Sequence, residues 1–126
     1  MFESINIHSS IPVYVQVEND VQFGIAAGNL KSGDQLPAAN ALAAKLGVHT
    51  NTVAKVYRDL EVMGLIFTRR GMGIFVNKGV ESKCRQQCHK HIVERMRQVV
   101  AEAKAAGMTA KQVKDIVQKC IVSEVV

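Results

Sequence analysis

Apolar residues recur at helical spacing near the N-terminus of this 126-residue chain. The first apolar stripe comprises Val13, Val17, Val21 and Ile25. Their four-residue spacing predicts one buried face of an α-helix. Either Ser9 or Ser10 is expected to cap this helix, with Pro12 in its first turn. The segment 28–36 contains a Gly-Asp pair and is expected to form a loop.

Two shorter apolar patterns follow and are separated by a tight turn. The first predicts a helix over residues 38–46, and Gly47 can end it in a left-handed conformation. A second helix is expected to begin at Thr50 or Asn51, either of which can cap it through a side-chain oxygen. The inner face of this second helix is Val53, Val56, Tyr57, Leu60 and Met63. This arrangement predicts a helix-turn-helix.

A short alternating pattern after Gly64 predicts a two-stranded hairpin. Its inward-facing positions are expected to be Leu65, Phe67, Ile74 and Val76. Arg69 and Arg70 lie near the tip of the hairpin, beside two glycines. Two arginines at a hairpin tip suit phosphates or a narrow minor groove. The complete stretch therefore predicts a winged helix-turn-helix, which places one helix in the major groove of DNA.

The last part of the chain predicts two further helices. Residues 78–80 are expected to form a hinge that separates residues 1–79 from residues 80–126. A long helix should run from Glu81 to Ala106, and Gly107 should end it. Thr109 is expected to cap the final helix.

Both of these helices carry apolar stripes, and the first has coiled-coil-like spacing. We expect dimerisation through Ile92, Met96, Val99, Ala103, Val113, Ile116, Val117 and Cys120. Two helices cannot bury such stripes against each other alone, so pairing with a second copy would form a four-helix arrangement. The alternative is that they fold back onto the winged domain.

The positive charge is concentrated in the predicted winged helix-turn-helix. The whole chain has a formal net charge of +5 and a pI of about 9.3. Residues 36–79 carry six basic and two acidic side chains, whereas residues 1–35 carry one basic and four acidic side chains. This distribution favours a polyanionic partner for the winged part of the chain.

Specific motifs in the same region resemble the GntR family of bacterial transcription regulators. These motifs are Pro12-Val13-Tyr14, Gly33-Asp34-Gln35-Leu36-Pro37, Leu46-Gly47-Val48, Asn51-Thr52-Val53 and Gly71-Met72-Gly73-Ile74-Phe75-Val76. The run Ala54-Lys55 followed by Tyr57-Arg58-Asp59-Leu60 and the short C-terminal part are similar to the YtrA subgroup. The resemblance implies a mainly α fold with a small β wing, followed by a two-helix dimerisation segment. It also implies a sequence-specific transcription regulator, a repressor rather than an activator, that binds a palindromic operator on double-stranded DNA as a homodimer.

Ten residues are expected to contact DNA. The polar face of the second helix carries Asn51, Lys55 and Arg58, with Thr50 and Thr52 beside them. Such side chains reach base edges or neutralise phosphates. The wing contributes Arg69, Arg70 and Gly71. The resemblance adds Asn40 and His49, with Asn40 standing where the family usually has Arg and therefore lacking that charged contact. His49 and Thr50 replace the Ser and Arg common in the wider family, so the operator is not transferable from relatives.

A cluster of thiols and imidazoles offers an alternative function. Cys84 and Cys88 are one helical turn apart, and His89 and His91 are nearby. The spacing does not match a tetrahedral zinc site, so no metal or cofactor is expected. Neighbouring basic residues could lower the pKa of a thiol, which would make the protein a thiol- or metal-responsive DNA-binding sensor. A second alternative is a winged helix used for protein contact.

Other function classes are not supported by the sequence. There is no nucleophile and base set and no phosphate-binding glycine loop, so we do not expect an enzyme. There is no secretory signal and no apolar run long enough to span a membrane, so a cytoplasmic protein with no membrane partner is expected. A small-molecule effector, if the protein has one, must bind the helical appendage or the dimer seam.

Overall fold

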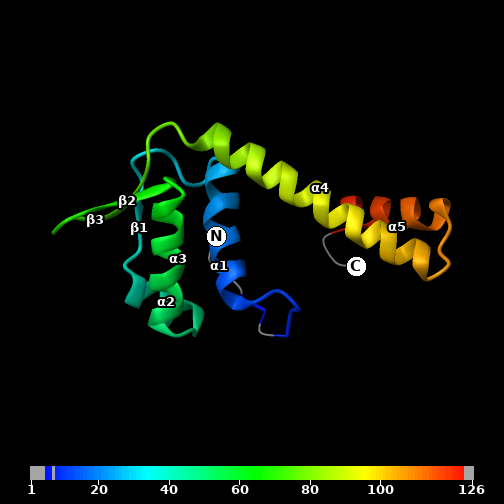
Figure 1. Cartoon of the computed structure of the whole chain (residues 1–126), viewed down its shortest axis with the longest axis horizontal. Coiled ribbons are helices and arrows are strands. Elements are labelled where there is room, and N and C mark those ends of the chain that lie inside the picture. The colour runs from blue at the N-terminus through cyan, green and yellow to red at the C-terminus, as the bar shows by residue number, and fades with distance from the viewer. Residues whose placement is uncertain (1–4, 7, 124–126) are drawn as a thin grey trace. The chain divides into compact units, whose positions relative to one another are not determined.

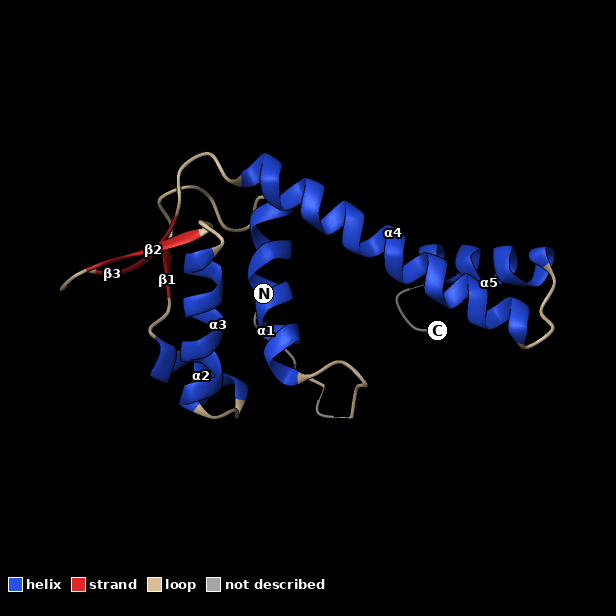
Figure 2. Cartoon of the chain, in the orientation of Figure 1, coloured by secondary structure: helices blue, strands red, loops and turns tan. Residues whose placement is uncertain are grey.

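The computed structural model describes residues 5–6 and 8–123 of the chain. It is mainly α-helical with a small β-sheet, as expected (Figures 1 and 2). The chain divides into two compact units, Met1–Cys88 and His89–Val126. The elements are α1 Val13–Ala26, β1 Gln35–Leu36, α2 Ala39–Leu46, α3 Thr50–Val62, β2 Ile66–Arg69, β3 Gly73–Val76, α4 Glu81–Ala105 and α5 Ala110–Val122.

Helix α3 is the central element of the first unit, because it contacts α1, α2 and β2. Four of the five residues predicted for its inner face, Val53, Val56, Tyr57 and Leu60, are at most 5% exposed, and the fifth, Met63, is half-buried. The first predicted stripe also lies toward the core, since Val17, Val21 and Ile25 of α1 are completely buried and Val13 is partly buried. Together with the buried residues of α2 and the sheet, these side chains form one hydrophobic core. The core therefore fixes which face of α3 remains available to a partner.

A partly buried hydrogen bond connects α3 to the loop before α2. The Tyr57 hydroxyl donates to the Pro37 carbonyl oxygen at 2.7 Å. Burial raises the pKa of Tyr57 to about 12. The hydroxyl therefore stays protonated and keeps donating at any physiological pH.

The turn between α2 and α3 forms as predicted. Gly47 has a φ of 69° and ends α2 in the left-handed conformation. The Val48 N–H donates back to the Ala43 carbonyl, which satisfies a terminal acceptor of the helix. The turn needs glycine here, since a side chain is strained at this φ.

Two predicted helix caps are wrong. Pro12 occupies the N-cap position of α1 without a side-chain hydrogen bond, and the Ser9 hydroxyl instead accepts from the Ile11 N–H. Helix α3 begins at Thr50, so that residue lies within the helix and does not cap it. The N-cap is His49, whose Nδ1 accepts from the Asn51 N–H at 3.2 Å.

The sheet has three strands rather than the two predicted. Its order is β1-β3-β2, and both neighbouring pairs are antiparallel. Strand β1 lies in the segment expected to be a loop, and Gln35 pairs with Phe75. Two residues give too short an alternation to distinguish a strand from a loop. Backbone pairing with β3 is what makes this segment a strand.

The facing of β2 also differs from the prediction. Ile66 pairs with Val76, and both are buried. Phe67 pairs with Phe75 on the other side of the sheet, where the two rings stack with centroids 5.6 Å apart. Leu65 is buried, but it belongs to the turn after α3, where its N–H donates to the Leu60 carbonyl. The strand therefore starts at Ile66, one residue later than expected. As a result Ile66 faces the core, and Phe67, which was expected to face inward, lies on the opposite face of the sheet.

The first turns of α4 form hydrogen bonds with the rest of the first unit. The Ser32 hydroxyl donates to a Glu81 carboxylate oxygen at 2.5 Å and accepts from the Gly79 N–H. This hydrogen bond from Ser32 lowers the pKa of Glu81. The Lys83 ammonium donates to the Met63 carbonyl at the end of α3. Cys84 is completely buried in the hydrophobic core.

Because of these contacts, the first compact unit extends to Cys88, beyond the boundary predicted at residue 79. The predicted assignment of DNA binding to residues 1–79 and of dimerisation to residues 80–126 remains a prediction. Helix α4 itself runs through the division, and its predicted limits agree with the observed ones to within one residue.

The C-terminal helix begins as predicted. Gly107 has a φ of 85° and follows the end of α4. Thr109 caps α5 in a reciprocal arrangement with Gln112, in which each side chain accepts from the backbone N–H of the other residue. This capping box fixes where α5 starts.

Candidate nucleic-acid interface

One side of α3 is polar and accessible. Asn51, Lys55 and Arg58 share this side and are all exposed, and Thr50 is exposed beside them. Thr52 is half-buried. Within the described residues, the Arg58 side chain forms no hydrogen bond or ion pair. Its guanidinium is therefore available to an external anion.

Lys55 has neighbours that the sequence did not reveal. Its ammonium nitrogen lies 4.7 Å from the centroid of the Tyr14 ring on α1. Glu18 lies near both Lys55 and Asp59: burial and Asp59 raise its pKa, whereas Lys55 lowers it. The positive charge of Lys55 is therefore partly balanced within the protein, in contrast to that of Arg58.

Asn40 lies in the first turn of α2 and is exposed. Its Oδ1 accepts from the Ala41 N–H at 2.8 Å. This bond leaves the side-chain amide group as the donor that can reach a partner. Ala38 before it forms no side-chain cap, so the start of α2 depends on its packing.

The tip of the wing presents two arginines. Arg69 and Arg70 are exposed, and the Met72 N–H donates to the Arg69 carbonyl across the turn. Gly71 has a φ of 77°, which explains why glycine occupies this position. The Arg69 guanidinium carbon lies 5.9 Å from the centroid of the Phe67 ring. The Phe67 ring thus supports one arginine while Arg70 has no described partner.

Gln35 of β1 holds the wing tip from the neighbouring strand. Its side-chain amide donates to the Met72 carbonyl at 3.1 Å. Gly73 follows with a φ of 127°, and a Cβ at this position would collide with the Gln35 amide. The absence of a side chain at Gly73 therefore makes room for the Gln35 contact. Sequence analysis missed this residue because β1 itself was not recognised.

We expect Gln35→Ala to weaken DNA binding without unfolding the protein. Gln35 is exposed, so its loss should change Tm by less than about 2 °C. A looser wing tip loses part of its preorganisation, and affinity for the operator should fall about threefold to fivefold. Fluorescence anisotropy titration and thermal unfolding measure the two effects. Gln86→Ala, at another exposed glutamine, is the matched control, and equal affinities for the two variants would contradict a role for Gln35.

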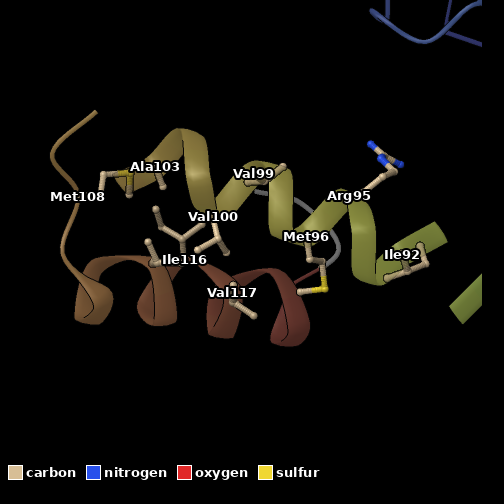
Figure 3. Close-up of a pocket in the computed structure, with 10 residues that line it drawn as sticks. Ile92, Arg95, Met96, Val99, Val100, Ala103, Met108, Ile116 and Val117 are labelled. Carbon is tan, nitrogen blue, oxygen red and sulfur yellow. The ribbon is translucent and has the colours of Figure 1, made fainter. Parts of the chain in front are cut away.

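The second unit contains an apolar groove between α4 and α5. The groove has a volume of about 320 Å³. Figure 3 shows Met96 and Val100 of α4 directed toward α5, and Ile116 directed toward α4. The lining residues are Ile92, Arg95, Met96, Val99, Val100, Ala103, Met108, Val113, Ile116 and Val117.

Seven of the eight residues predicted for dimerisation therefore line one groove. The exception is Cys120, which is exposed on α5 outside the lining. Val99 is 59% exposed, Met96 50% and Ile116 46%. No residue of α5 is buried within the single chain. Large apolar side chains left this accessible on two adjacent helices are typical of an interaction surface.

The thiols do not have the lowered pKa considered from the sequence. Burial raises the pKa of Cys84 from its ordinary value of 9.0 to about 11, and burial also raises that of Cys88. Lys83 opposes this shift at Cys84, but its effect is smaller than that of burial. Because the thiolate is the reactive form, Cys84 is a poorly reactive core residue.

Within residues 5–6 and 8–123, no group of three or more His, Cys, Asp or Glu side chains is arranged to hold a metal ion. None of the helices in this part of the chain combines the length and the hydropathy needed to span a membrane.

Comparisons with known proteins show which family the chain resembles. Residues 13–76 match the family described as "Bacterial regulatory proteins, gntR family". The HTH-type transcriptional repressor YtrA of Bacillus subtilis is 29% identical over 91% of this chain and 88% of its own length. A solved GntR family transcriptional regulator from Listeria monocytogenes is 25% identical, with a TM-score of 0.70, over 90% of this chain and 98% of its own.

Some solved relatives are complexes with an operator. The DNA-binding domain of AraR in complex with operator ORX1 is 30% identical and has a TM-score of 0.52, over 57% of this chain and 89% of its own. The match covers about as much of this chain as its winged helix-turn-helix occupies.

Proposed function

This chain belongs to the GntR family of bacterial regulatory proteins and is a DNA-binding transcription regulator of the YtrA-like kind, and we propose on that premise that it is a homodimeric repressor of a palindromic operator. Support for repression comes from the YtrA relative, whose name states that activity. A repressor has to reach the DNA that it controls, so we propose that the protein is cytoplasmic.

The observation that carries this proposal is the exposed polar side of α3. The opposite side of the same helix forms the centre of the core, so the fold holds α3 rigidly while leaving Asn51 and Arg58 accessible. Rigid presentation of such a face is what insertion into the major groove requires. A winged helix used for protein contact has no comparable need for the unpaired Arg58 guanidinium.

Each element has a role in the proposed complex. Asn51 and Thr52 contact base edges, and Arg58 contacts the backbone. Lys55 gives a weaker contact than Arg58 because its ammonium already lies against the Tyr14 ring and interacts with the charge of Glu18. The wing tip, with Arg69, Arg70 and Gly71, holds phosphates or the adjacent minor groove. Asn40, His49 and Thr50 contact the same half-site from the helix-turn-helix.

Dimerisation is proposed through the groove between α4 and α5. The exposed apolar side chains there become buried when the same pair of helices from a second chain packs against them. Two-fold symmetry then presents two α3 helices to two half-sites, separated by about 10 base pairs or a multiple of that distance. The dimer interface formed by α4 and α5 therefore sets the distance between half-sites that the operator must match.

The test is selection of an operator from a pool of random duplexes, followed by titration against the selected and a scrambled duplex. We expect an enriched palindrome that is bound at least about a thousandfold more tightly than the scrambled duplex at physiological salt. Failure to enrich any sequence, or equal affinity for both duplexes, would contradict the proposed function.

A further inference from the structure

His49 has one ring nitrogen committed to the protein and one left free. Its Nδ1 accepts a hydrogen bond from the Asn51 N–H at 3.2 Å, which is the N-cap of α3. A nitrogen that accepts in this way carries no proton. The neutral ring therefore carries its single proton on Nε2. The cap thus fixes both the tautomer of the ring and the side of the ring that can donate.

The free nitrogen lies at the part of the protein that faces DNA in the proposed complex. His49 is exposed and directly precedes the first turn of α3, where Thr50 and Asn51 are also exposed. Among the described residues, none accepts a hydrogen bond from Nε2. The N-terminal residues of a recognition helix are the ones that contact base edges. His49 therefore offers one oriented N–H donor, with no acceptor beside it, at that point.

The chemistry of the base edges indicates which base such a donor fits. In the major groove, guanine presents two acceptors, N7 and O6, whereas adenine places a donor beside its single acceptor. Cytosine presents a donor, and thymine pairs its acceptor with a methyl group. Guanine is the base that offers a lone N–H donor two acceptors, with neither a donor nor a methyl group beside them.

We propose that His49 is a specificity-determining residue, which caps α3 through Nδ1 and donates from Nε2 to guanine in each half-site. This inference rests on the proposed function, because it requires an operator in the major groove. At this position the wider family commonly has serine. A serine hydroxyl can cap the helix, but it is too short to extend beyond the cap as the imidazole of His49 does.

Two substitutions separate the cap from the base contact. His49→Ser keeps a capping oxygen, so it should unfold at the wild-type Tm. His49→Ala removes the cap, and Tm should fall by about 4 °C. Both variants should lose about tenfold in affinity for the operator selected by the wild-type protein, because both lack the Nε2 donor. Neither should lose affinity for a scrambled duplex.

Replacement of single guanines in that operator by 7-deazaguanine, which lacks the N7 acceptor, identifies the base. The wild-type protein should lose severalfold in affinity at one symmetry-related position, and His49→Ser should show no further loss there. Equal sensitivity of the wild-type and serine proteins at every position would overturn the inference. A loss in His49→Ser that is the same for operator and scrambled duplex would also overturn it, since this result indicates a phosphate contact. If the wild-type protein selects no operator, the proposed function fails instead.

Discussion

Val99→Asp should convert the protein from a dimer to a monomer and reduce affinity for a palindromic operator by at least about a hundredfold. Val99 is 59% exposed in the single chain, so an aspartate costs little there. In the proposed dimer, the same carboxylate would be buried in the apolar interface, and burial of an unpaired charge costs several kcal/mol. Loss of the seam also removes the linkage that brings the second half-site into reach.

Analytical ultracentrifugation measures the mass, and anisotropy titration measures the affinity. The matched control is Gln98→Asp, which introduces the same charge at the adjacent exposed position outside the groove lining. The control should remain a dimer with unchanged affinity. A dimeric Val99→Asp protein, or a monomer that binds the palindrome as tightly as the wild type, would contradict the proposed seam.

Replacement of both wing arginines by alanine should reduce operator affinity by at least about a hundredfold, because each charged hydrogen bond to a phosphate contributes about 1.5–3 kcal/mol. The double variant Arg69→Ala/Arg70→Ala leaves the turn intact, since Met72 bonds to the Arg69 backbone. Each lost phosphate contact should also flatten the dependence of log affinity on log salt by about one unit. A dimer of the double variant lacks four arginines, so its slope should change by about four units.

The control for this variant removes the same charge elsewhere. Lys111 and Lys114 are exposed on α5, and their double replacement by alanine should lower affinity only through net charge. Titrations at 50 and 200 mM salt distinguish the two cases. An equal change of salt slope in both double variants would show that the wing acts through long-range charge and makes no direct contact.

The helices were predictable because their apolar spacing is long and regular. The stripe from Val17 to Ile25 and the inner face of α3 extend over several turns, and burial follows them closely. Gly47, Gly107 and Thr109 marked helix ends correctly, since each satisfies a local requirement of the backbone. These features depend on neighbours in sequence, which is why the sequence was sufficient.

The sheet was less predictable because its faces depend on partners distant in sequence. Strand β1 contains two residues, and only its pairing with β3 distinguishes it from a loop. Because Leu65 lies in the turn after α3, the residue of β2 that faces the core is Ile66, where Phe67 was predicted. The side chains of the candidate site were affected in the same way. Tyr14 beside Lys55 and Gln35 beside the wing tip are contacts between separate elements that periodicity does not reveal.

The N-cap of α3 was also predicted incorrectly from the sequence. Thr50 and Asn51 are better capping residues than histidine by general preference, so the sequence favoured them. The observed start of α3 at Thr50 places His49 at the cap, and this one-residue shift is what leaves Nε2 as the exposed donor.

In the proposed complex, two copies of this chain bind one operator through their α3 helices and wings. The most direct test is the stoichiometry of the complex with the selected palindrome, measured by sedimentation equilibrium at several salt concentrations. We predict two chains per duplex, with affinity that falls steeply as salt increases and is lost on the scrambled duplex. One chain per duplex, or binding that ignores both sequence and salt, would contradict the account.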